Sequence, residues 1–189
     1  IFMLSGYVPW FFISETIVGG SRSIRQNSQF VTKLSFPVSN IMTFCTMASL
    51  IIHVGMCVIM YAILLFSGYG PSVYNLQILY YMPLMYAFFL VLAWTTAPLS
   101  AFSRDFENLI NAVITGLFWL SGIFWDTYDI KNPVLRTIMY LNPINYFING
   151  YRKTFLYEKF IFDSNYTTEL IVFYAEFALL ILVGGYFYN

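Results

Sequence analysis

Ionisable side chains are scarce in this chain of 189 residues. Asp, Glu, Lys and Arg make up only 10% of it, against about 25% in soluble globular domains. The nine basic and nine acidic residues cancel, so no net basic field is present to hold a nucleic acid. Hydrophobic residues make up 59%, far more than in a disordered chain. The composition excludes a nucleic-acid partner and favours a protein embedded in lipid.

One long stretch, from Leu34 to Ser103, contains no Asp, Glu, Lys or Arg at all. A helix of about 20 apolar residues crosses the hydrocarbon core of a bilayer, so this stretch is long enough for two crossings. The turn over residues 67–72 contains Gly and Pro, which end helices. We therefore expect membrane spans at about Asn40–Phe66 and Leu76–Phe102.

Three further apolar runs extend this pattern. Leu109–Phe124 predicts a short crossing and Leu170–Tyr188 a full-length one. Ile1–Gly20 is a fifth candidate, although it contains Glu15. The predicted fold is all-α: one polytopic bundle over residues 1–189, with about five transmembrane helices.

Groups that would hold a metal or a nucleotide are also missing. Cys45 and Cys57 lie on one predicted helix with a rise of roughly 18 Å between them, too far apart for a disulfide. His53 is the single histidine and has no second ligand at metal spacing, so no metal site is predicted. No G-x-x-x-x-G-K-[ST] motif occurs to bind ATP phosphates. We expect no catalytic residue and no cofactor in this chain, and an energy source on a partner.

Charge in the connecting segments predicts the orientation. Gly20–Pro37 carries three basic residues and no acid, and Ser103–Asn108 carries Arg104 and Asp105. The positive-inside tendency places both segments in the cytoplasm. Alternation then places residues 67–75 and 126–168 outside. The last segment holds five basic residues, which conflicts with a simple count, but it is long and carries compensating acids.

Two short helices are predicted within the outer segment, at Pro133–Leu141 and Pro143–Leu156. Each begins at the Pro of an Asn-Pro pair, with Asn at the N-cap and Pro at the first helical position. At about 13 and 21 Å they are too short to cross a bilayer. We expect them to dip into the membrane and return beside a wet pathway, because irregular backbone at that depth needs polar cover.

Several motifs in order resemble the membrane subunit of type-2 ABC exporters, most closely the teichoic-acid and O-antigen or capsule export permeases. They are Pro9-Trp10-Phe11-Phe12, Arg25-Gln26-Asn27 through Lys33 to Phe36-Pro37, Arg104-Asp105, Ser121-Gly122-Ile123-Phe124-Trp125, Leu141-Asn142-Pro143 and Tyr151-Arg152. The resemblance implies six helices per subunit, a homodimer, and two copies of an ATPase subunit that binds ATP and Mg. It also implies that an amphipathic N-terminal helix, a first span and a basic C-terminal tail lie outside this sequence.

The resemblance assigns roles to three segments. The short inner segment resembles the coupling helix that docks the ATPase, with Gln26, Asn27, Phe30 and Lys33 as its contact residues. Arg104 and Asp105 fall at the cytoplasmic turn between the fourth and fifth family spans. The two short outer helices resemble external gate helices, with Asn142, Pro143, Tyr146 and Arg152 as candidate gate residues. The cations Arg152 and Lys153 on the second of these helices either meet anionic phosphates of the substrate or anchor the helix at lipid headgroups.

Polar and aromatic side chains within the predicted spans have two interpretations. Phe89 and Thr96 on one span, and Thr115, Phe118 and Trp119 on the next, either line a sugar path or serve ordinary helix packing. His53 is more readily explained as a packed histidine than as a proton relay. Glu176 is either functional or a buried carboxyl that faces other helices.

The favoured function is the transmembrane subunit of an ATP-driven exporter that moves a lipid-linked polysaccharide or teichoic acid across the cell membrane. The alternative within transport is a permease for a drug or small lipid. A membrane-embedded transferase acting on lipid carriers is less favoured, since Asp126 and Asp129 form its single candidate acid pair. Expected partners are the ATPase, a second copy, membrane lipid and the lipid-linked polymer.

Overall fold

The computed structural model describes residues 1–33 and 37–188, except for the side chains of residues 30, 32, 33, 38 and 186–188. The described part is helical and contains no strand. Its α-helices are α1 (Phe2–Gln26), α2 (Ser28–Lys33), α3 (Val38–Phe66), α4 (Ile78–Phe102), α5 (Arg104–Leu120), α6 (Pro133–Tyr140), α7 (Pro143–Arg152) and α8 (Thr167–Tyr188). Shorter turns are η1 (Val73–Gln77), η2 (Thr127–Asp129), the π-helical η3 (Lys153–Tyr157) and η4 (Ser164–Tyr166).

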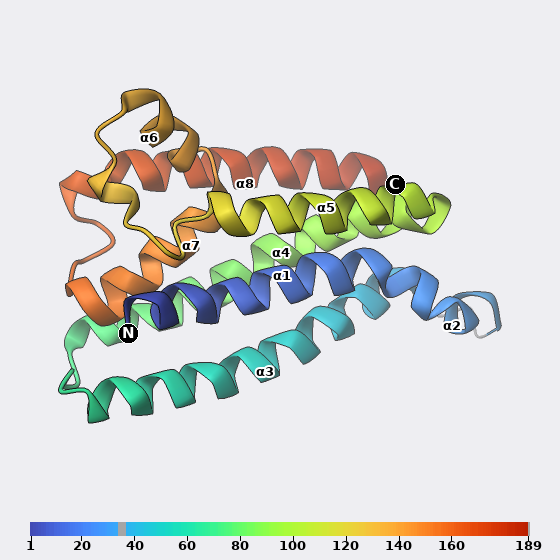
Figure 1. Cartoon of the computed structure of the whole chain (residues 1–189). Coiled ribbons are helices and arrows are strands. Elements are labelled where there is room, and N and C mark those ends of the chain that lie inside the picture. Colours follow the sequence, from blue (N-terminus) through green and yellow to red (C-terminus); the bar gives the residue numbers. More distant parts are fainter. Residues whose placement is uncertain (34–36, 189) are drawn as a thin grey trace.

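The expected all-helical membrane bundle is confirmed. Three segments are long and apolar enough to cross a membrane: Ser39–Phe66, Val73–Phe102 and Ser164–Gly185. The other two predicted spans correspond to α1 and α5, which run beside them (Figure 1). α1 has 25 residues but is more polar, and the 17 residues of α5 extend only about 25 Å, less than the ~30 Å hydrocarbon core.

α1 is the central helix of the bundle. It packs against α3, α4, α5 and α7. Small residues on its buried side, including Ser5, Gly6 and Gly20, let the neighbouring helices approach closely. A Cβ atom at Gly20 would lie only 2.8 Å from the Cβ of Ala93 on α4. A larger residue at this position would therefore separate α1 from α4.

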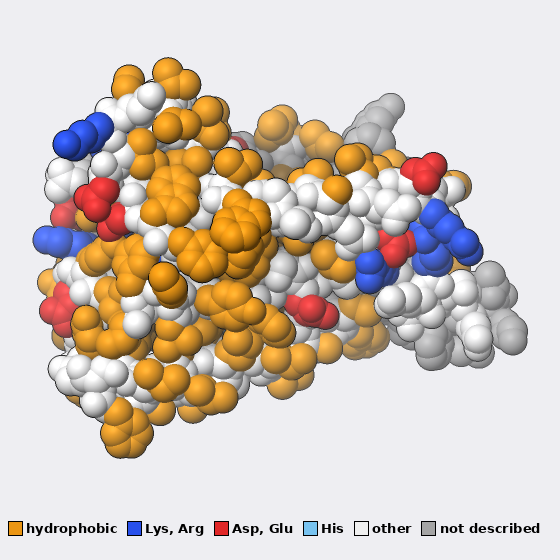
Figure 2. Space-filling view, in the orientation of Figure 1, with side chains coloured by type: hydrophobic (Ala, Val, Ile, Leu, Met, Phe, Trp, Pro, Cys, Tyr) orange, Lys and Arg blue, Asp and Glu red, His pale blue; other side chains and the backbone are white. Residues whose placement is uncertain are grey.

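The two ends of the bundle differ from its middle. Figure 1 places α2 and the start of α5 at one end, here called the α2 end, and α6, α7 and the N-terminus at the other, the α7 end. Charged side chains gather at both ends, and apolar side chains cover most of the surface between them (Figure 2). An apolar belt between two charged ends is the surface expected of a protein that spans a bilayer.

The predicted helix boundaries at the α7 end are close to the observed ones. The Asn132 side chain accepts hydrogen bonds from the backbone N–H of Val134 at 2.9 Å and Leu135 at 3.4 Å, which starts α6. The predicted helix Pro143–Leu156 is in fact composite, because α7 gives way to the π-helical η3. Glu158, with a positive φ of 49°, ends that turn.

The inner segment also differs from the prediction in detail. Gln26 belongs to the end of α1, and Asn27 follows it as the C-cap. The separate short helix begins at Ser28. The predicted loop continued through residues 34–36, which lie outside the described residues.

Candidate functional site

An ion-pair cluster at the α2 end joins α1 to α5. The Arg22 Nε lies 2.6 Å from Glu107 Oε1, and Arg25 pairs with the other carboxylate oxygen. Arg25 also donates to the carbonyl oxygens of Ser100 and Ser103 at the end of α4. This cluster, here called the arginine clamp, holds the helix that leads into α2 against the α4–α5 junction.

Sequence reasoning placed these residues in two inner segments but missed their pairing. The opposite charges of the two segments could have indicated the pairing, since one inner segment has only basic charges and the other carries Glu107. Of the predicted coupling residues, Gln26 is exposed and Asn27 half-buried, with the Asn27 side chain donating to the Ser23 carbonyl at 2.9 Å. The side chains of Phe30 and Lys33 lie outside the described residues.

Arg104 and Asp105 are both exposed at the first turn of α5, at the same end of the bundle as α2. An acid in a first turn is favourable because it faces the positive end of the helix dipole. The α2 end therefore offers exposed charged and amide side chains around a pre-formed clamp, a surface on which a partner can dock.

One side of α5 is exposed along its whole length. Its members, here called the α5 face, are Asn108, Ala112, Thr115, Gly116 and Trp119. At 100° per residue they occupy an arc of about 100°. A Cβ atom at Gly116 would have no described atom within 4 Å. Within the described structure this small residue thus packs against no other helix.

Aromatic rings gather at the end of the α5 face. Trp119, 67% exposed, stacks on Phe124 with ring centroids 5.7 Å apart and an interplanar angle of 26°. Phe118 packs edge-on against both rings and contacts Trp10 of α1 at 5.4 Å. Two of the residues predicted to line a channel, Phe118 and Trp119, are therefore in one exposed aromatic cluster.

The other predicted lining residues lie elsewhere. Phe89 is buried against Phe88 and Phe147, and Thr96 is half-buried with its hydroxyl bonded to the Leu92 carbonyl at 2.9 Å. Thr115, on the α5 face, lies about 200° from Leu117, which shares an apolar pocket with Phe89. Of the two interpretations, helix packing describes Phe89, which belongs to the core, whereas Thr115 and Trp119 lie on an outer face.

At the α7 end, the structure contradicts the expectation that Arg152 faces anionic phosphates. Its side chain is fully buried and donates to the carbonyl oxygens of Ile123 at 2.8 Å and Trp125 at 3.3 Å. The guanidinium also lies 3.7 Å from the ring centroid of Phe2. Burial lowers the pKa of Arg152, but a guanidinium remains charged in proteins. The carbonyl oxygens and the ring surround the charge, and the Asp126 carboxylate adds a favourable Coulombic interaction.

Lys153 is buried as well, in a network that sequence reasoning did not find. Its ammonium pairs with Glu169 at the start of α8, and Glu169 also accepts from Asn149 at 2.8 Å and Tyr128 at 3.0 Å. Burial and the nearby carboxylate raise the pKa of Tyr128, so its hydroxyl stays protonated and donates. The ring of Tyr166 lies 3.9 Å from the ammonium. This network fastens α7 to α8.

The remaining gate candidates also hold α7 in place. Asn142 caps the helix by accepting from the Ile144 N–H at 3.0 Å, and Pro143 begins it. Tyr146 is buried, stacks on Phe173 at 4.1 Å, and shares a 2.9 Å hydrogen bond with the hydroxyl of Tyr80. α7 is accordingly a core helix, whereas the side chains of α6 are mostly exposed.

Residues 1–156 match the ABC-2 type transporter family. The chain belongs to this family. It is 23% identical over 155 residues to the O-antigen export system permease protein RfbA of Myxococcus xanthus, which covers 82% of this chain. The chain spans 60% of the length of that relative. Membership and the long apolar helices together establish a multi-pass protein of the cell membrane.

The two ionisable candidates named from the sequence, His53 and Glu176, lie within the membrane helices of this ABC-2 family member. His53 on α3 is fully buried, with Nε2 2.6 Å from the hydroxyl of Tyr151 and its ring 5.2 Å from that of Phe12. These contacts join α3 to α7 and α1. Glu176 on α8 is half-buried, and its Oε2 has no hydrogen-bond partner among the described residues.

Proposed function

We propose that this chain is the transmembrane subunit of an ATP-driven exporter for a lipid-linked polysaccharide or teichoic acid. It works as a homodimer with two copies of an ATPase subunit. Family membership and the likeness to an O-antigen export permease support the class of transporter. The observation that carries the proposal is the α5 face, where the aromatic ring of Trp119 and the hydroxyl of Thr115 are exposed within the apolar belt and the amide of Asn108 is exposed near the charged α2 end.

The chemistry of the α5 face suits a sugar polymer. Flat rings such as Trp119 stack on the apolar faces of sugar rings, while Thr115 and Asn108 can exchange hydrogen bonds with sugar hydroxyls. Polar side chains facing lipid are costly, so this face turns toward water or toward another protein. The Thr115 hydroxyl bonds within its own helix at 2.9 Å and keeps a free acceptor position.

The small residues of the α5 face support the second copy. Ala112 and Gly116 are four residues apart, the spacing at which transmembrane helices pack closely. Because both are exposed, no described residue of the chain packs into this spacing. Two copies that meet through part of this face would enclose the remainder as a conduit.

The arginine clamp supports the proposed coupling route. A push on α2 by an ATPase would reach α5 through Arg22, Arg25 and Glu107, because these ion pairs join the two helices directly. The conduit-lining helix and the docking helix are thus mechanically linked at the α2 end.

The test uses the full-length permease with its ATPase in cells that export the polymer. Trp119→Ala should lower export at least ten-fold while ATP hydrolysis persists. The matched control is Phe44→Ala on α3, since Phe44 is 63% exposed and Trp119 67%. Equal export by both variants contradicts a sugar path along the α5 face, and retained transport of a drug or small lipid in place of polymer would favour the alternative permease.

A further inference from the structure

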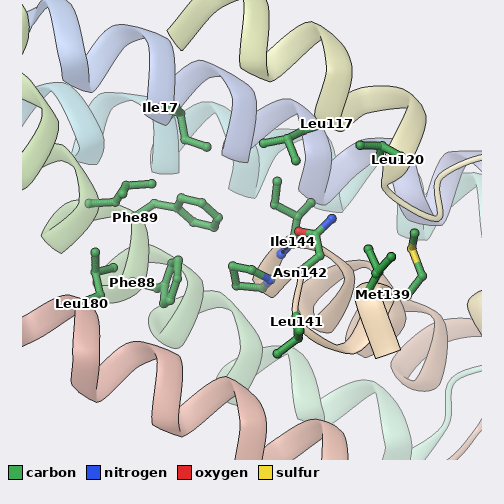
Figure 3. Close-up of a pocket in the computed structure, with 13 residues that line it drawn as sticks. Ile17, Phe88, Phe89, Leu117, Leu120, Met139, Leu141, Asn142, Ile144 and Leu180 are labelled. Carbon is green, nitrogen blue, oxygen red and sulfur yellow. Dashed lines mark hydrogen bonds between the residues drawn. The ribbon is translucent and has the colours of Figure 1, made fainter. Parts of the chain in front are cut away.

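An apolar pocket of about 420 Å³ lies near the α7 end, between α1, α4, α5 and α8. Figure 3 shows its lining side chains converging from these helices and from the α6–α7 connection, among them Ile17, Phe89, Leu117 and Asn142. This space belongs neither to the α5 face nor to the arginine clamp.

The pocket results from the short length of α5. The 17 residues of α5 end at Leu120, whereas the neighbouring α4 and α8 have 25 and 22 residues. Beyond Leu120 the chain turns aside, and the α6–α7 connection covers the gap that α5 leaves. Lining residues at the rim are exposed: Leu120 by 54%, Ile138 by 49% and Leu141 by 59%. The pocket therefore opens onto the apolar surface of a membrane protein.

Its chemistry excludes water as a stable occupant. Among the described residues that line it, Asn142 alone is polar, and its amide is engaged with the Ile144 N–H at 3.0 Å and the Ser121 hydroxyl at 3.4 Å. Apolar cavities of this kind stay dry and bind apolar ligands. Since the rim faces lipid, the acyl chains of the bilayer are the apolar ligand available to the pocket.

We propose that this pocket binds one acyl chain of a bilayer phospholipid, in the leaflet at the α7 end. A dry cavity of about 150 Å³ accommodates benzene, with six carbons, so about 420 Å³ accommodates roughly 17 carbons. That is the size of a single acyl chain. A polyprenyl carrier is several times longer, so the pocket would enclose only a part of it.

α6 lies beside the opening of the pocket. It is a short helix with exposed apolar residues, Val134 and Leu135, beside the exposed cation Arg136. Such a helix lies in the plane of the interface, with its cations at the level of lipid phosphates. Arg136 lies about 160° around α6 from the lining residue Ile138 and donates to the Tyr140 hydroxyl at 3.0 Å. Ile138 and Leu141, not Arg136, therefore bring α6 into contact with an acyl chain in the pocket, which holds α6 against the bundle.

The first test measures lipid retention by the full-length permease, purified from nanodiscs and examined by native mass spectrometry. Wild type should retain one phospholipid per chain, and Leu180→Trp, which fills the pocket, should reduce that retention at least ten-fold. The control is Leu179→Trp on the adjacent, 62% exposed position of α8, which should retain the lipid. Equal retention in the two variants overturns the proposal.

A second measurement needs no substitution, so it holds even if Leu180→Trp misfolds. A phospholipid with a diazirine in its acyl chain should label the peptide that contains Ile138–Ile144 in proteoliposomes. Labelling there by a diazirine polyprenyl phosphate but not by the phospholipid contradicts the assignment, as does photocrosslinking of that peptide to a second copy. Neither experiment measures polymer export, so a result that overturns the lipid proposal leaves the proposed cargo unaffected, and the reverse also holds.

Discussion

Arg152 and Lys153 are adjacent and both fully buried, but they are stabilised in different ways. Carbonyl oxygens and an aromatic ring surround the guanidinium of Arg152, whereas a carboxylate neutralises Lys153. Removing Glu169 would leave an isolated ammonium in the core, and removing Lys153 would leave an isolated carboxylate. Replacing only one member of this buried pair is therefore more destabilising than replacing both.

The first prediction concerns this pair. Lys153→Met should lower the free energy of unfolding by about 3–5 kcal/mol, because the Glu169 carboxylate then remains buried without a counter-ion. The double variant Lys153→Met with Glu169→Leu should recover most of that loss. Thermal unfolding of the full-length protein in detergent measures both, with Lys131→Met at an exposed cation as the control. Additive losses in the double variant would show that the pair is not coupled.

Neither the buried Lys153–Glu169 pair nor the partly exposed Arg25–Glu107 pair was visible in the sequence. Lys153 and Glu169 are sixteen residues apart across two turns, and Arg25 and Glu107 are 82 apart. Local patterns report helix caps and apolar runs, but they do not report which distant charges meet. Without that information, the sequence predicts that Arg152 and Lys153 are exposed and face a ligand, whereas both are buried.

At the scale of helices, α6 and α7 begin with the same Asn-Pro signal but have different environments. The caps were predictable because they depend on residues within one turn. Burial was not, because it depends on Tyr80, Tyr81 and Phe173 from other helices packing on α7. The structure separates the predicted gate pair into a fixed helix, α7, and an exposed one, α6.

The second prediction tests how tightly α7 is packed. A Cβ atom at Gly150 would lie 2.3 Å from a ring carbon of Tyr81, so Gly150→Ala forces α7 away from α4. We expect a loss of about 1–3 kcal/mol in the free energy of unfolding. Gly55→Ala on α3 should be neutral or stabilising, since a Cβ there has no described atom within 4 Å. Equal stability of the two variants would contradict the close α4–α7 contact.

The third prediction concerns the arginine clamp. Glu107→Gln removes the charge that both Arg22 and Arg25 face, and should cost only about 1 kcal/mol of stability because the pairs are partly exposed. If the clamp carries the push from α2, polymer export should fall several-fold while ATP hydrolysis continues. Asp105→Asn, at an exposed position two residues earlier, is the control. Normal export by Glu107→Gln would remove the clamp from the coupling route.

At the scale of the whole molecule, composition and charge spacing were sufficient to predict an all-helical membrane bundle with charged ends. Three spans follow from length and hydropathy alone. α1 is different: its small and polar residues allow it to pack at the centre of the bundle, but they also lower its hydropathy, so hydropathy alone does not predict this position. Only the three-dimensional structure identifies the faces that remain exposed after packing, above all the α5 face.

The fourth prediction concerns orientation. With Cys45 and Cys57 replaced by Ser, cysteines at Ser72 and Ser164, both near the α7 end, should react with an impermeant thiol reagent in intact cells. A cysteine at Gln26, near the α2 end, should react only after permeabilisation. The reverse pattern would invert the bundle in the membrane and place α2 away from any cytoplasmic ATPase.

The proposed function depends on an α5 face that lines a wet conduit between two copies. Its most direct test is thiol labelling of Thr115→Cys in the full-length dimer with its ATPase, again without Cys45 and Cys57. A polar thiol reagent should modify Thr115→Cys, and bound polymer should protect it. Val58→Cys, at a 65% exposed position on α3, should stay unmodified because it faces lipid. Labelling of Thr115→Cys no faster than Val58→Cys, with or without polymer, would contradict the account.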